Sequence, residues 1–162
     1  MRRLGLAGRL GGEATMGHRS ADEPQPNAEW NQFMARLEAA EVEFAHGRPD
    51  DFKGLWSHGD DVTLCGGLGG ATEVGWKNVA TRLDWASSNY ADGTRDRQEF
   101  NCQLFGDIAF LVQKEIIEAR LCGGTERSRQ ELRVTMVFRR FGEGWRIIHR
   151  HADSQTAVHH PQ

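Results

Sequence analysis

Apolar side chains recur at helical spacing between residues 28 and 46, which predicts an amphipathic helix with one buried face. Asn27 can cap the start of this helix, and Gly47 can end it because glycine readily adopts the left-handed conformation found at helix ends. The positions on the predicted buried face are Trp30, Phe33, Met34, Leu37 and Phe44.

Two more helices are expected in the first half of the chain. Pro49 can begin a short helix, whose apolar stripe would be Phe52, Leu55 and Trp56. Helical spacing returns from about Val74 to Tyr90, and Asp92-Gly93 then provides a turn. Between these helices, residues 61–65 are β-rich, and a glycine-rich segment follows at residues 66–70.

The pattern changes to strands after residue 93. Alternating segments at residues 94–105, 108–121, 129–141 and 145–153 are separated by short glycine-containing turns, as in a four-strand antiparallel meander. On the last strand, alternation places Trp145, Ile147, His149 and His151 on one face. Helices followed by a long sheet indicate an α+β domain, with three helices packed on a curved antiparallel sheet.

The chain has 162 residues, enough for one domain of ordinary size. We expect a disordered tail at residues 1–26, with Met16 as an alternative start, a domain at 27–156 and a second tail at 157–162. No apolar run approaches the roughly 20 residues of a membrane-spanning helix. The net charge of −3 gives no broad attraction for nucleic acid or an anionic membrane, so neither partner is expected. Three cysteines without metal-site spacing fit a cytoplasmic location.

The order of elements and the ending Gly-Glu-Gly-Trp-Arg-Ile-Ile-His-Arg-His-Ala-Asp-Ser at residues 142–154 resemble the nuclear transport factor two-like superfamily. Its SnoaL-like and ketosteroid-isomerase-like group is the best match. The ending also resembles the association domain of calmodulin-dependent protein kinases, which oligomerises. The resemblance implies a cone-shaped, cystatin-like α+β barrel, in which a curved sheet wraps a helix and encloses a pocket. It leaves the reaction open, because this fold serves enzymes as well as binding and assembly modules.

The residues of the steroid isomerases do not carry over to this chain. The position of their proton-abstracting aspartate falls at or near Gly66, which has no side chain. Their tyrosine in the first helix has no counterpart, since Tyr90 is the only tyrosine. Steroid-type enolisation is therefore not expected. No Asp-Arg-Asp set matches the epoxide-hydrolase relatives either.

Three residues are candidates for catalysis. His149 and His151 lie two apart on a strand and can present two imidazoles to one cavity for proton transfer. Two histidines can also begin a metal site, but no third ligand can be named, so no metal is predicted. Glu115 shares a strand face with Gln113 between apolar residues, which would raise its pKa. The alternative for each histidine is a hydrogen bond to a neighbouring residue or a place at a subunit contact. The alternative for Glu115 is a cross-strand ion pair, for example with Arg133.

Aromatic side chains are candidates for a ligand pocket that suits an apolar or aromatic molecule with one polar group. The alternative interpretation is that these rings fill the core. Arg120, Arg127, Arg129 and Arg133 cluster near a hairpin and would form either an anion pocket or a solvated surface. The expected pocket residues are Trp56, Trp76, Trp85, Tyr90 and Gln113.

Two hypotheses of function follow. The first is a domain that binds a small organic molecule, with cofactor-free acid-base chemistry such as isomerisation, dehydration or cyclisation if it is an enzyme. The second is a non-catalytic module for homo-oligomerisation or ligand sensing. A homodimer fits both hypotheses.

Overall fold

The computed structural model describes residues 28–121 and 123–154, and the tails expected at residues 1–26 and 157–162 lie outside them. The helices are α1 (Ala28–Ala45), α2 (Asp50–Lys53) and α3 (Trp76–Ser87). The first two strands are short, β1 (Thr63–Cys65) and β2 (Glu73–Val74). The other four are long: β3 (Tyr90–Phe105), β4 (Ile108–Leu121), β5 (Arg127–Phe141) and β6 (Gly144–Ser154).

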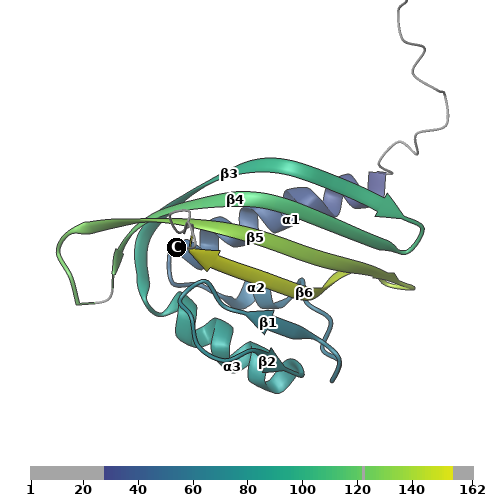
Figure 1. The fold of residues 1–162 in the computed structure, drawn as a ribbon, viewed down its shortest axis with the longest axis horizontal. Helices are drawn as coiled ribbons and strands as arrows, with labels where there is room; N and C mark the ends of the chain where they lie inside the picture. The colour runs from purple at the N-terminus through teal and green to yellow at the C-terminus, as the bar shows by residue number, and fades with distance from the viewer. Residues whose placement is uncertain (1–27, 122, 155–162) are drawn as a thin grey trace, which may run out of the picture.

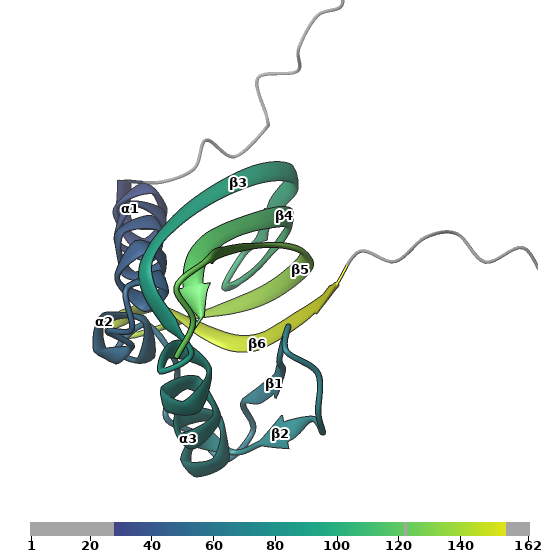
Figure 2. The same cartoon turned by 90° about the vertical axis from the view of Figure 1, so that its left-hand side faces the viewer.

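The strands form one sheet in the order β2-β1-β6-β5-β4-β3 (Figure 1). Strands β3 to β6 are the expected antiparallel meander, while β1 runs parallel to β6, which makes the sheet mixed. Figure 2 shows the long strands curling strongly, with α1 lying along the open side of the curl and α3 below it beside β1 and β2. The α+β class is confirmed, but the sheet does not close into a barrel.

The core fills the concave side of the sheet. The predicted face of α1 packs there, with Trp30 and Phe33 each 3% exposed and Leu37 fully buried. Trp30 meets Phe138 and Trp145 edge-on, with ring centroids 5.2 and 4.9 Å apart, the geometry that aromatic pairs prefer. This aromatic cluster packs the first turns of α1 against β5 and β6.

Two local predictions are wrong. Tyr90 is the first residue of β3 rather than part of α3, which ends at Ser87. The Asp92-Gly93 turn signal marks an irregularity inside β3, where the register with β4 shifts between Ala91 and Thr94. Asp92 has φ of +51°, and Asn and Asp tolerate this left-handed conformation better than most residues do. The same dipeptide therefore serves as a bulge in a strand instead of a turn between elements.

Candidate functional site

A cavity of about 50 Å³ lies between the three helices and the concave side of the sheet. We call it the central cavity. It has room for roughly three to five water molecules. Its walls are apolar side chains from α1, α2, α3, β1, β4 and β5 and the glycine-rich segment after β1, and its polar lining is Tyr90, Arg82, Arg95 and Arg150. The apolar lining residues are Phe44, Phe52, Leu64, Leu68, Leu83, Ala86, Ile117 and Leu132.

Glu115 sits behind this lining, fully buried on the inner face of β4. Arg150 Nη2 donates to its Oε2 at 2.6 Å, and Gln113 Nε2 donates to its Oε1 at 2.8 Å. Arg95 also forms an ion pair with Oε1. Both carboxylate oxygens are therefore occupied by protein donors, and Glu115 orients the two arginines that reach the cavity. The proposed cross-strand partner Arg133 instead pairs with Asp153.

A second buried carboxylate completes the cluster. Glu41 projects from α1 with only 1% of its surface exposed, and its Oε1 lies 2.9 Å from Arg95 Nη2. Arg95 thus stands between Glu41 and Glu115. We call Glu41, Arg95, Gln113, Glu115 and Arg150 the buried charge cluster. Such a cluster is rarely more stabilising than apolar packing, so it points to a functional site rather than to a device for stability.

The two carboxylates of the cluster have opposite pKa shifts. Burial alone would raise the pKa of Glu115, but the charges of Arg150 and Arg95 and the hydrogen bonds from Gln113 and Arg150 outweigh burial and hold that pKa below its usual value. The expected rise is therefore wrong. Burial raises the pKa of Glu41 from 4.5 to about 7, against the opposing charge of Arg95 and with a contribution from the negative charge of Glu115. Of the two carboxyl groups in the cluster, Glu41 is the one whose pKa lies near neutral pH.

Tyr90 is the expected pocket residue that the structure places in the cavity lining. Its hydroxyl donates to Gln130 Oε1 at 2.8 Å, and burial raises the pKa of the phenol. The ring is therefore neutral and held in place. It can offer its hydroxyl oxygen as an acceptor to a ligand.

His149 and His151 do not share a face with Trp145 and Ile147, so that part of the prediction is wrong. The pairing of β5 with β6 skips one residue, because Val137 pairs with His149 and Phe138 with Ile147. This bulge at Ile148 reverses the alternation. Arg150 consequently reaches the cavity, whereas His149 Nδ1 lies 2.7 Å from Thr63 Oγ1 and His151 is exposed.

The three tryptophans expected in the pocket are absent from the lining of the central cavity. Trp56 is 1% exposed and packs in the core against Phe52, with ring centroids 6.4 Å apart. Trp76 stacks on His58 at 4.0 Å. Trp85 is 46% exposed and lies under the guanidinium of Arg82. Gln113 is likewise behind the lining, where it holds Glu115.

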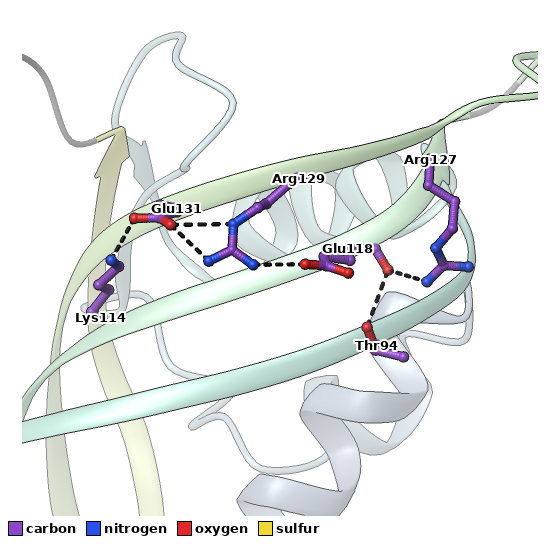
Figure 3. Close-up of polar contacts among 6 residues, drawn as sticks. All are labelled: Thr94, Lys114, Glu118, Arg127, Arg129 and Glu131. Atoms are coloured by element: carbon purple, nitrogen blue, oxygen red, sulfur yellow. Dashed lines mark hydrogen bonds and ion pairs between the residues drawn. The ribbon is translucent and has the colours of Figure 1, made fainter.

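The arginines near the β4–β5 hairpin pair with neighbouring acids instead of forming an anion pocket. Figure 3 shows Arg129 between Glu118 and Glu131, with Lys114 on the far side of Glu131 and Arg127 donating to the Glu118 carbonyl. Arg129 Nη1 lies 2.6 Å from Glu118 Oε1, and Arg129 Nη2 lies 2.8 Å from Glu131 Oε1. Arg120 pairs with Asp92. These pairs are largely exposed, and such pairs stabilise a fold only weakly.

The glycine at the expected position of the isomerase base lies in the cavity wall. Gly66 and Gly67 both line the cavity, and a Cβ on Gly67 would lie 2.6 Å from Leu132 Cδ1. The missing side chains are what allow this segment to approach the cavity closely. Within residues 28–121 and 123–154, no three His, Cys, Asp or Glu side chains converge as ligands of a metal ion.

Sequence reasoning missed Glu41, Arg95 and Arg150. Glu41 could have been found, since it lies four residues after Leu37 on the apolar face of α1, where a carboxylate is unusual. Arg95 and Arg150 could not, because each follows an irregularity in its strand that changes which side chains point inward. No residue pattern marks the bulge at Ile148.

Comparison with known proteins agrees with this architecture. The family model described as "SnoaL-like domain" matches residues 31–156, and the chain belongs to this family. No curated protein matches the chain. Among the described helices, none is both long and apolar enough to cross a membrane.

Solved structures share the fold at low sequence identity. One is a candidate calcium/calmodulin-dependent protein kinase type II association domain from Thiobacillus denitrificans, with 22% identity over 82% of this chain and 97% of that one and a TM-score of 0.59. A candidate dehydratase of the NTF2-like family from Streptomyces avermitilis is 20% identical over 80% of this chain and 95% of that one, with a TM-score of 0.67. A ketosteroid isomerase-like protein from Erwinia carotovora atroseptica is 15% identical over 81% of this chain and 99% of that one, with a TM-score of 0.66. Another NTF2-like structure is described as having a cystatin-like fold.

Proposed function

We propose that this SnoaL-like chain binds a small organic molecule in the central cavity, with its apolar body against the helices and its polar group toward Arg95, Arg150 and Tyr90. The observation that carries the proposal is the buried charge cluster behind an otherwise apolar lining. Ligand sites commonly combine apolar walls with a few convergent polar groups in this way. The cavity favours a ligand with few heavy atoms, because its volume is about 50 Å³.

The same groups support acid-base chemistry that uses only side chains of the protein. Arg95 and Arg150 would stabilise negative charge that develops on a bound oxygen, since two guanidinium groups are already held in place by Glu115. Glu41 would exchange a proton near pH 7. Isomerisation, dehydration and cyclisation all belong to this class of reaction, and we propose a cofactor-independent isomerase or lyase as the enzymatic form of the function.

Ligand-observed NMR with a library of small organic fragments tests the binding function. We expect Arg150→Met to weaken the binding of hits at least about tenfold, because it removes a charged donor from the lining. His151→Ala is the matched control on the next residue and should change affinity less than about twofold, because its side chain is exposed away from the cavity. A hit whose affinity depends on His151 but not on Arg150 would contradict the proposal.

A second candidate function, assembly into a homodimer, is favoured by the outer face of the sheet. The residues that alternate with the buried ones on β4 include Phe110, Val112 and Ile116, and Val137 of β5 pairs with Phe110. These side chains are only half-buried in the single chain, and no described helix covers them (Figure 2). A second copy packed on this face would bury them while leaving the cavity intact.

Cytoplasmic location remains a prediction from the cysteine content.

A further inference from the structure

We infer that the ligand of the central cavity is a small monocarboxylate with an apolar body, and that its binding places a proton on Glu41. The inference rests on the proposed function and specifies its ligand class. It combines three observations: two arginine side chains in the lining whose buried Nε atoms have no described acceptor, the balance of charges in the buried cluster, and the position of Glu41 behind Arg95.

The first observation concerns the donors that Arg95 and Arg150 leave free. Among the described residues, none accepts a hydrogen bond from the buried Nε atoms of these two arginines. Both side chains line the cavity, and that of Arg95 is only 6% exposed. A buried donor without an acceptor is unfavourable, and a carboxylate supplies two acceptor oxygens in the geometry that guanidinium groups match. A neutral amide supplies only one acceptor oxygen, and its NH₂ group is itself a donor that cannot accept a hydrogen bond from the arginines.

The second observation is the charge balance. Arg95 and Arg150 give the cluster two positive charges. Glu115 is ionised at neutral pH because its pKa is lowered, whereas Glu41 is partly protonated near pH 7. With both carboxyl groups ionised, the cluster itself is neutral, and the only positive charge left in the described cavity lining for an arriving anion is that of Arg82. With Glu41 protonated, the cluster carries one net positive charge that the anion neutralises. Anion binding and protonation of Glu41 therefore favour each other.

The third observation is that Glu41 borders a second, surface pocket as well as lying behind Arg95. Arg95 borders the cavity and also a surface groove formed with Glu38, Glu41, Val42, Asp96 and Arg97. A proton can therefore reach Glu41 through the groove while the ligand occupies the cavity. The charged groups that face Glu41 or border this groove are Arg95, Arg97 and Asp96 of β3, Glu115 of β4, Arg150 of β6 and Glu38 of α1.

The experiment compares acetate, propionate and butyrate with their neutral amides by isothermal titration calorimetry on the full chain. We expect each carboxylate to bind at least about tenfold more tightly than its amide at pH 6. The affinity of the carboxylates should then fall by up to about tenfold between pH 6 and pH 8, as Glu41 loses its proton in the free protein. At pH 8, titrations in two buffers of different ionisation enthalpy should show uptake of up to about one proton per ligand.

Two variants assign the proton. In Glu41→Gln the amide mimics the protonated acid, so carboxylate affinity should stay the same from pH 6 to pH 8 and proton uptake should disappear. Glu38→Gln is the matched control, one helical turn away and exposed, and it should keep the pH dependence of the natural chain. If Glu41→Gln fails to fold, the two-buffer titration of the natural chain still tests whether ligand binding takes up a proton.

The outcomes separate the inference from the proposed function. If the amides bind as tightly as the carboxylates, the ligand is not specifically a carboxylate. If Arg150→Met still weakens their binding, the proposed binding function nevertheless stands. Carboxylate binding without proton uptake at pH 8, or with uptake that persists in Glu41→Gln, would overturn the role of Glu41. If none of these probes and no fragment of the NMR library binds, the proposed function fails as well.

Discussion

Arg150 lies between two histidines on β6, and its guanidinium points inward while both imidazoles lie on the other face of the strand. The cause is the single additional residue at the β5–β6 bulge. A side chain with five donors thereby reaches the cavity, and Glu115 holds it by a 2.6 Å hydrogen bond. The chemical character of the cavity is therefore cationic rather than imidazole-based.

The raised pKa of Glu41 predicts a pH-dependent stability. The folded state binds this proton more tightly than the unfolded chain, so the contribution to stability is fully present below pH 4.5 and is lost as the pH rises through 7. The loss amounts to about 3 kcal/mol. Urea unfolding of Glu41→Gln should show a gain over the natural chain that grows by about 2 to 3 kcal/mol between pH 5 and pH 8. Equal pH dependence in the two proteins would contradict the burial of an ionisable Glu41.

Single residues were predictable where alternation continues without interruption. Strand β4 keeps its alternation from residue 108 to 120, so the inward position of Gln113 and Glu115 could be predicted. The pKa of Glu115 could not, since its sign depends on Arg95 and Arg150, which approach from two other strands. Periodicity describes one element at a time and contains no information about these partners.

At the scale of elements, the close contact between α1 and β3 depends on Gly93. A Cβ at this position would collide with the Ala45 carbonyl and lie 2.8 Å from Ala45 Cβ, at the end of α1. Because the obstacle is backbone, a side chain cannot move aside to relieve it. Helix α1 carries Glu41 and β3 carries Arg95, so this contact also positions the buried ion pair.

We therefore expect Gly93→Ala to destabilise the fold by about 3 kcal/mol or more, measured by urea unfolding. Gly142→Ala is a suitable control, because a Cβ at residue 142 meets nothing within 4 Å. It should change stability by less than about 0.5 kcal/mol. Similar stability of the two variants would mean that α1 and β3 do not pack as described.

The long elements were predictable because each has a sustained period. Helix α1 and the four long strands follow the expected segments, with ends that differ by a few residues. The two-residue strand β2 and the parallel pairing of β1 with β6 could not be predicted, because short strands have no period and pairing is a long-range contact.

At the scale of the whole molecule, a curved sheet has two different faces. The concave face holds the core and the cavity, whereas the outer face of β4 and β5 combines half-buried apolar residues with the row of ion pairs around Arg129 (Figure 3). A second copy could use the apolar part of this face without obstructing the cavity. The two proposed functions, ligand binding and assembly, therefore do not exclude each other.

If the chain is a homodimer through this face, Val112→Lys should convert it to a monomer, because the substitution would bury a charge at the interface. Light scattering would then give a mass near 18.2 kDa in place of twice that value. Arg133→Gln, on the same face but exposed and paired with Asp153, should leave the dimer intact. A natural chain that is monomeric at all concentrations would contradict the assembly proposal.

The proposal that arginines rather than histidines hold the ligand is tested by an NMR titration with butyrate or a fragment that binds. The titration follows the side-chain Nε–H signals of arginine together with the ring signals of histidine. We predict that the Arg95 and Arg150 signals shift with ligand concentration, because both side chains line the cavity. The His149 and His151 signals should stay in place. Shifts confined to the two histidines would show that the ligand binds elsewhere and would contradict a ligand site at Arg95 and Arg150.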